Sequence, residues 1–170
     1  MWIDRIVELE KGSRCVAVKN VSLAEEHLHD HFAATDDYPA TPVMPAPLII
    51  EGMAQTAGIM VGHARDFAEK VILAKIGKAR FDRDVYPGHT LRYTATMDRI
   101  DDSGASTTGL VELIDNAVDN PEPVAIGEIE LMFSHIDQNR RGLDFPEHNF
   151  VFTDQFMDLM RNSGFAQPTS

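Results

Sequence analysis

The feature that most constrains the fold is an apolar stretch at residues 45–64, whose composition suits a helix. Pro47 fits the first turn of a helix, where a backbone N–H would have no intrahelical acceptor in any case. The apolar residues that follow cover nearly the whole helical circumference, and such a helix must be buried on most sides. The sequence therefore predicts a long central helix that the rest of the chain surrounds.

Much of the remaining chain has the two-residue periodicity of β-strands. We expect strands over residues 13–21, 71–81, 91–97, 106–114 and 123–134. In the last of these, the residues expected to face the core are Ala125, Ile129, Leu131 and Phe133. Short turns separate the later strands, which favours antiparallel neighbours, while the polar residues 22–42 are expected to form a loop. The predicted fold class is α+β, an antiparallel β-sheet wrapped around a long central helix.

The length of 170 residues fits one domain, which we place at residues 1–135. Residues 136–170 are expected to form a C-terminal extension with a short amphipathic helix. Thr153 suits the N-cap of that helix and Gly164 its end. Its apolar side is expected to consist of Phe156, Met157 and Met160.

Charge and cysteine content exclude several classes of function. Lys and Arg number 15 against 27 Asp and Glu, so the formal net charge is −12. Such a surface repels nucleic-acid phosphates and anionic lipid. The single cysteine, Cys15, lies among apolar residues and is expected to be a buried thiol in a reducing compartment. Because the sequence also has no visible signal peptide or membrane span, we expect a cytoplasmic protein.

Glu51 is the residue that does not fit the apolar helix. A carboxylate buried there would cost several kcal/mol unless it were paired or protonated. Burial raises the pKa of a carboxyl group, and a carboxylic acid that stays protonated near neutral pH can act as a general acid. Gln55 lies one turn later on the same face, within reach of a hydrogen bond. The alternative is that Glu51 points outward and is solvated.

Two further features could complete a reaction site. His31, at the start of the polar loop, is a candidate for proton abstraction near pH 7, although a solvated loop histidine is the alternative. The N–H of Ala46, at the start of the helix, could bind a substrate carbonyl oxygen. An acid, a base and such a donor together suit proton abstraction next to a carbonyl group.

The same residues resemble a known family. His31-Phe32, Pro42-Val-Met-Pro45 and Glu51-x-Met-Ala-Gln55 are similar to the β-hydroxyacyl-(acyl carrier protein) dehydratases of the FabA/FabZ type. A later segment, Lys78-Ala-Arg-Phe-x-x-x-Val-x-Pro-Gly88, resembles the strand–turn–strand of that family, and the resemblance extends from about residue 2 to 135. Glutamate at position 51 is typical of the FabZ branch, because FabA has aspartate there.

The resemblance implies a hotdog fold and an enzyme of fatty acid biosynthesis that needs no cofactor. It implies that His31 removes the α-proton of a (3R)-hydroxyacyl thioester and that Glu51 of a partner subunit protonates the departing hydroxyl. Ala46 would polarise the thioester carbonyl, and we expect Met44 and Gln55 to contribute to substrate binding. The implied partners are an acyl carrier protein or coenzyme A thioester and further copies of the chain, as a homodimer or trimer of dimers.

The sequence also departs from the family pattern. The link formed by residues 32–41 is longer than in the family, and Ala46 replaces a glycine, so a positive φ there would be strained. Docking of an acidic carrier protein would need a basic patch. Its candidates are Lys75, Lys78, Arg80, Arg83, Arg140 and Arg141.

Three alternatives to the dehydratase remain open. The chain could be a hotdog acyl-thioester hydrolase, or an acyl-thioester-binding protein without catalysis. The third alternative is a metal site, since His27, His29 and His31 would share one face of a strand. We expect no metal, because the spacing does not match the metallo-β-lactamase pattern.

Overall fold

The computed structural model describes residues 1–136 and 151–165, and the following elements lie within them. The strands are β1 (Arg5–Glu10), β2 (Arg14–Asn20), β3 (Lys70–Phe81), β4 (His89–Asp101), β5 (Gly104–Asp115) and β6 (Val124–Ile136). The helices are α1 (Glu26–His29), α2 (Ala46–Ala64) and α3 (Asp154–Asn162). The predicted central helix and the five predicted strands are therefore confirmed, with boundaries that differ by a few residues. No helix in these described ranges is long and apolar enough to cross a membrane.

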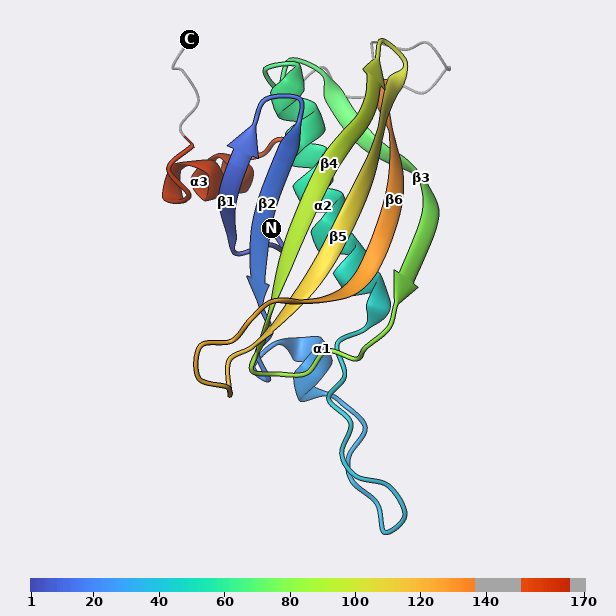
Figure 1. Ribbon diagram of the computed structural model, residues 1–170, viewed down its shortest axis with the longest axis vertical. Helices are drawn as coiled ribbons and strands as arrows, with labels where there is room; N and C mark the ends of the chain where they lie inside the picture. The colour runs from blue at the N-terminus through green and yellow to red at the C-terminus, as the bar shows by residue number, and fades with distance from the viewer. Residues whose placement is uncertain (137–150, 166–170) are drawn as a thin grey trace.

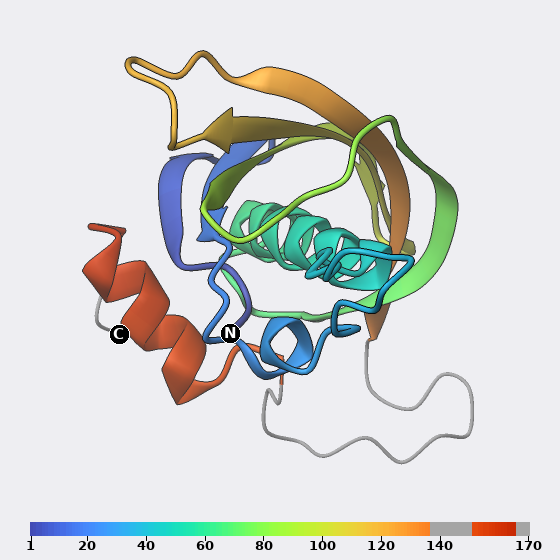
Figure 2. The ribbon, with the colours of Figure 1, turned by 90° about the horizontal axis from the view of Figure 1, so that it is seen from below.

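The strands form one antiparallel sheet in the order β1-β2-β4-β5-β6-β3. The sheet curves around α2, which lies in its concave face (Figures 1 and 2). This arrangement confirms the predicted α+β architecture. Its physical reason is the apolar circumference of α2, which a flat sheet could cover on one side only.

The core lies between α2 and the inner face of the sheet. The two-residue periodicity of 91–97 predicts that Leu91, Tyr93, Ala95 and Met97 face inward; the first three are fully buried, and Met97 is half-buried. Along α2, Ile49, Met53, Met60 and Val61 are buried against these strands. Residues at the start of α2 are exposed or half-buried, so this helix leaves the core at its N-terminal end.

The predicted inward face of β6 is correct at Ile129, Leu131 and Phe133 but wrong at Ala125. Val111 pairs with Gly127, whereas the next residue, Glu112, pairs with Ala125. Ile126 is therefore an extra residue in β6, a β-bulge that reverses the inside–outside alternation. Ile126 is 1% exposed and takes the inward place expected of Ala125.

The polar segment 22–42 contains a short helix, α1, that the sequence did not predict, and β1 was also missed. Leu28 anchors α1, because its side chain is fully buried in the core. Beyond it the chain forms a projecting loop, in which Phe32 and Thr41 make an isolated antiparallel bridge (Figure 1).

Helix α3 confirms the helix predicted in the C-terminal extension. Thr153 takes the N-cap position, and Gly164 follows the helix with a φ of +85°. The buried side contains Leu159 with Phe156 and Met160, whereas Met157 is half-buried. α3 lies beside β1 (Figure 1), where the Ile6 N–H donates to Ser163 Oγ at 2.9 Å. Helix α3 and the core between α2 and the sheet therefore form one packed body.

Candidate active site

The start of α2 is held in place by the strand–turn segment that follows β3. The N–H of Met44 donates to the carbonyl oxygen of Val85 at 2.8 Å, and both side chains are buried. Gly88, with a φ of +96°, donates its N–H to the carbonyl of Val21. The bond between Met44 and Val85 joins the Pro42–Pro45 block to the Lys78–Gly88 segment, two of the blocks on which the resemblance rests.

Ala46, the first residue of α2, is exposed. Its N–H belongs to the first helical turn, where no carbonyl of the helix is available to accept it. In the described residues, a positive φ outside glycine occurs at Asp66, Phe67 and Asn120. The strain expected from a positive φ at Ala46 is therefore absent, because Ala46 has helical backbone and keeps its N–H.

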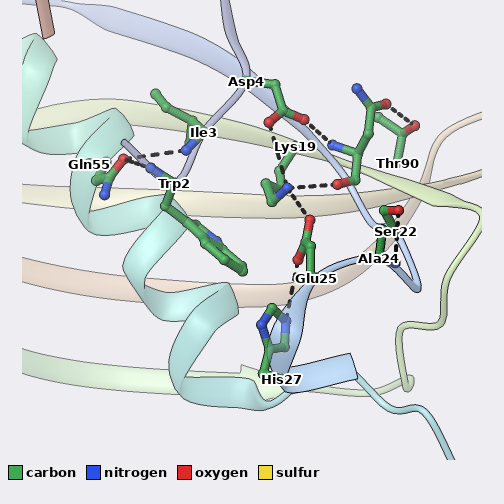
Figure 3. A network of polar contacts seen from close by, with 11 residues as sticks. Trp2, Ile3, Asp4, Lys19, Ser22, Ala24, Glu25, His27, Gln55 and Thr90 are labelled. Carbon is green, nitrogen blue, oxygen red and sulfur yellow. Dashed lines mark hydrogen bonds and ion pairs between the residues drawn. The ribbon is translucent and has the colours of Figure 1, made fainter. Parts of the chain in front are cut away.

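The expectation that Glu51 is buried is wrong for the single chain, in which its side chain is exposed. The reason is the face of α2 that Glu51 occupies: Ile49, Gly52 and Met53 beside it are buried, so Glu51 lies on the side of the helix that the sheet does not cover. The expected contact with Gln55 is confirmed, since Gln55 Nε2 donates to Glu51 Oε1 at 2.8 Å. The opposite end of the Gln55 amide accepts the Trp2 N–H at 2.8 Å and the Ile3 N–H at 3.3 Å (Figure 3).

His31 lies just beyond α1 and is half-buried. Its Nδ1 is 2.8 Å from the carbonyl oxygen of Leu28. A carbonyl oxygen can only accept a hydrogen bond, so Nδ1 of a neutral imidazole must carry the proton. The other nitrogen, Nε2, is then unprotonated and can act as a base. Since Leu28 is fully buried, the imidazole is tied to a rigid part of the chain.

Within the described part of the chain, no hydrogen bond or ion pair joins His31 to Glu51. The structure brings Glu51, Gln55, Ala46 and Met44 to the first half of α2 and the segment before it. His31 follows α1 by two residues, and α1 lies at the same end of the molecule as the start of α2 (Figure 1).

A polar network that the sequence reasoning missed lies beside the site. Lys19 is 6% exposed, and its Nζ is 2.5 Å from Glu25 Oε1 and 3.5 Å from Asp4 Oδ1. Glu25 Oε2 is also 3.3 Å from His27 Nε2 (Figure 3). A sequence signal exists: Lys19 occupies an inward position in the buried alternation of Cys15, Ala17 and Val21. An inward lysine predicts a partner carboxylate.

The structure contradicts the three-histidine metal site. His27 and His29 belong to helix α1, so they do not alternate with His31 along a strand. His29 Nδ1 is 3.2 Å from Asp30, and His27 faces Glu25. In the described ranges, no group of three His, Cys, Asp or Glu side chains could hold a metal ion.

Two of the basic candidates are paired with acids. Lys78 Nζ is 2.9 Å from Glu128 Oε2, and Arg80 is 2.9 Å from Asp82. The pairing raises the pKa of Lys78 through its hydrogen bond to Glu128. Arg140 and Arg141 lie outside the described residues.

Solved structures with the same architecture include a dehydratase complex and an acyl-CoA hydrolase. The dehydratase heterocomplex ApeI:P from Xenorhabdus doucetiae aligns with a TM-score of 0.58 at 16% identity, over 82% of this chain and 85% of that one. The acyl-CoA hydrolase from Staphylococcus aureus, in complex with butyryl coenzyme A and coenzyme A, aligns with a TM-score of 0.56 at 16% identity. That alignment covers 83% of this chain and 75% of the hydrolase. These likenesses establish the hotdog fold.

Sequence comparison defines the family. Residues 1–119 match the model of the FabA-like domain. Two similar curated relatives are each named 3-hydroxyacyl-acyl-carrier-protein dehydratase FabZ. The protein from Solibacter usitatus is 36% identical over 149 residues, which cover 86% of this chain and 83% of the relative. The protein from Magnetococcus marinus is 43% identical over 100 residues, 57% of this chain and 61% of the relative. The chain belongs to the FabA-like family of FabZ-type hotdog proteins, as the resemblance implied.

Proposed function

We propose that the protein dehydrates a (3R)-hydroxyacyl thioester to the trans-2-enoyl thioester in fatty acid biosynthesis. The curated relatives carry the name of this activity. The observation that carries the proposal is the hydrogen bond from His31 Nδ1 to the Leu28 carbonyl oxygen. It fixes the tautomer of the neutral imidazole and leaves Nε2 unprotonated, so that Nε2 can act as a base. Neither proton transfer needs a cofactor.

In this mechanism, Nε2 of His31 removes the α-proton of the substrate. The electron pair of that C–H bond forms the Cα=Cβ double bond, while the Cβ–O bond breaks. The departing oxygen takes a proton from the carboxylic acid of Glu51 and leaves as water. The imidazolium of His31 then loses its proton and Glu51 regains one, so the enzyme returns to its starting state.

The start of α2 would bind the thioester. The free N–H of Ala46 lies at the positive end of the helix dipole, where it stabilises negative charge that develops on the carbonyl oxygen. Met44, immediately before the helix, is held by Val85 and presents a buried apolar side chain suited to lining an acyl chain. Gln55 contributes to the reaction through its hydrogen bond to Glu51.

We also propose that the site is completed by a second copy of the chain, as a homodimer or a trimer of dimers. β3 is at the edge of the sheet, and its inner face is not covered. Leu73 and Ile76 pair with inward-facing Phe133 and Leu131, yet they are 38% and 45% exposed. An apolar inner face on a free edge strand is typical of an interface between copies. Glu51 could then meet His31 of the partner.

The thioester carrier would be an acyl carrier protein, as the names of the relatives state, or coenzyme A. The candidates for carrier recognition are the exposed Lys75 and Arg83, which form no ion pair within the described residues, rather than the paired Lys78 and Arg80. A cytoplasmic location agrees with the buried, unpaired Cys15.

The test is the reverse reaction, hydration of a short trans-2-enoyl thioester followed by the loss of enoyl absorbance. We expect absorbance to fall without release of free thiol. His31→Ala and Glu51→Gln should each lower kcat by about 10²–10⁴-fold. His29→Ala is the matched control, because His29 is exposed two residues away and should leave the rate unchanged.

Other results would contradict the proposal. Release of free thiol would make the protein a thioester hydrolase. Binding of the thioester without turnover, with either carrier, would make it a binding protein. A normal rate for either variant would refute the assigned roles.

A further inference from the structure

The side-chain amide of Gln55 lies between two kinds of partner with opposite requirements. Its oxygen accepts the backbone N–H groups of Trp2, at 2.8 Å, and Ile3, at 3.3 Å. Its nitrogen donates to Oε1 of Glu51 at 2.8 Å. A backbone N–H can only donate, and an ionised carboxylate can only accept. The amide therefore has one orientation that satisfies both sides, and turning it over would break all three bonds.

The segment that holds the amide oxygen is itself firmly held. Ile3 is 2% exposed, and the Asp4 N–H donates to the carbonyl of Val18 at 2.9 Å. The carboxylate of Asp4 accepts the Asn20 N–H at 2.6 Å and lies 3.5 Å from the buried Lys19. Lys19 Nζ also lies 4.9 Å from the centre of the Trp2 ring. Figure 3 shows the bonds of Trp2 and Ile3 to Gln55 and the ion pair of Asp4 with Lys19.

We propose that the N-terminal segment 2–4 positions the acid of the reaction through Gln55, which occupies Oε1 of Glu51 and leaves Oε2 as the oxygen that exchanges the proton. The inference rests on the proposed function, in which Glu51 is the general acid. Gln55 is a positioning residue, since it acts through Glu51.

The chemistry explains why this arrangement is useful. A carboxyl group that rotates freely presents either oxygen to the substrate, with the proton on either one. With Oε1 engaged as an acceptor, the proton of the neutral acid belongs on Oε2. After the proton has moved to the departing oxygen, the same amide N–H stabilises the carboxylate that remains. Gln55 thus fixes the geometry before the transfer and stabilises the charge after it.

The first test needs no catalysis. The side-chain 15N–1H resonances of Gln55 should be followed by NMR between pH 3 and pH 8. We expect one amide proton to shift as Glu51 titrates and to lose that dependence in Glu51→Gln. Gln155, exposed on α3, provides an internal reference that should not follow this titration. An unperturbed Gln55 amide across the range would overturn the proposal, whatever the activity of the protein.

The second test is the variant Gln55→Glu. A glutamate keeps an oxygen to accept the Trp2 and Ile3 N–H groups, but it replaces the donor to Glu51 with an acid. The other charged or titratable groups around this site are Asp4, Lys19, Glu25 and His27: Lys19 pairs with Asp4 and Glu25, and Glu25 also faces His27. We expect kcat at pH 8 to fall at least tenfold with little change in KM. The ratio of variant to wild-type kcat should rise as the pH is lowered, because a protonated glutamate again donates to Glu51.

The matched control is Gln155→Glu, which makes the same charge change on α3 and should leave the pH profile unchanged. A loss in Gln55→Glu that is constant with pH would indicate a structural effect and would overturn the proposal.

The role of the N-terminal segment 2–4 is tested by a pair of variants. Trp2→Ala removes the ring but keeps the backbone N–H, whereas Trp2→Pro removes both. We expect kcat of Trp2→Pro to be about three- to tenfold below that of Trp2→Ala, the factor that one net hydrogen bond represents. Equal rates would show that the segment does not act through Gln55. An inactive wild type would refute the proposed function alone, since the NMR titration still decides the role of Gln55.

Discussion

Replacing Gly52 with alanine should destabilise the protein, whereas the same replacement at Gly58, in the same helix, should stabilise it. A Cβ atom at position 52 would lie 2.4 Å from both Cζ and the hydroxyl oxygen of Tyr93. At position 58 the nearest atom would be a ring carbon of Phe133 at 3.6 Å, an ordinary van der Waals contact. The two variants therefore share the chemical change and differ in the space available.

The expected change in the free energy of unfolding follows from two opposing contributions. Alanine is favoured over glycine inside a helix by about 1 kcal/mol, which helps both variants. At position 52, overpacking a dense core costs about 1–3 kcal/mol. The cost there should be near the upper end, because Tyr93 is fully buried and its ring cannot move into solvent. We expect a net loss of about 1–2 kcal/mol for Gly52→Ala and a net gain of about 0.5–1 kcal/mol for Gly58→Ala.

The assay is urea unfolding followed by circular dichroism. All variants must be compared at one protein concentration, because the proposed dimer would gain apparent stability with concentration. The double variant Gly52→Ala/Tyr93→Phe provides a check, since it removes one of the two atoms at 2.4 Å and should recover part of the loss. If Gly52→Ala is as stable as Gly58→Ala, the close contact between α2 and β4 does not exist as described.

Three further predictions concern other parts of the chain. Burial raises the pKa of the Cys15 thiol to about 12, so a thiol reagent at pH 8 should react with Cys15 only after unfolding. Hydrogen bonds from Ser103 hold the pKa of Asp101 at about 2, so its stabilising effect is present above its unfolded value near 4 and is lost as the pH falls towards 2. Asp101→Asn should therefore remove part of the stability change in acid unfolding between these values. Phe156→Ala should cost about 3–5 kcal/mol in urea unfolding, because Phe156 is 1% exposed and its ring contacts Phe67. A loss below 1 kcal/mol would show that α3 does not belong to the main core.

The helix and strands could be predicted because their signals are local. The apolar circumference of α2 and the alternation of Leu91, Tyr93 and Ala95 depend on residues close together in the chain, and both were confirmed. Helix α1 was missed because its four residues are polar apart from Leu28, which a tertiary contact buries. The inward place of Ile126 was missed because a bulge depends on pairing with β5. The division of the chain at residue 136 stays a prediction.

In the candidate site, too, some features could be predicted from local sequence and others depend on tertiary contacts. His31, Glu51 and Gln55 could be singled out from residue type and spacing, and the family they indicate is confirmed by the match over residues 1–119. The exposure of Glu51 in the single chain could not be predicted, because it depends on which side of α2 the curved sheet leaves uncovered.

The sequence by itself determined the buried helix, the antiparallel strands and the residue types that can move protons, since each follows from side-chain chemistry and local periodicity. Only the tertiary structure decided which atoms those residues use. The Leu28 carbonyl leaves Nε2 as the unprotonated nitrogen of a neutral His31. Trp2 and Ile3, more than fifty residues before Gln55 in the chain, fix the amide that faces Glu51. A hydrogen bond depends on distance and direction, and folding alone brings such distant groups within hydrogen-bond distance of each other.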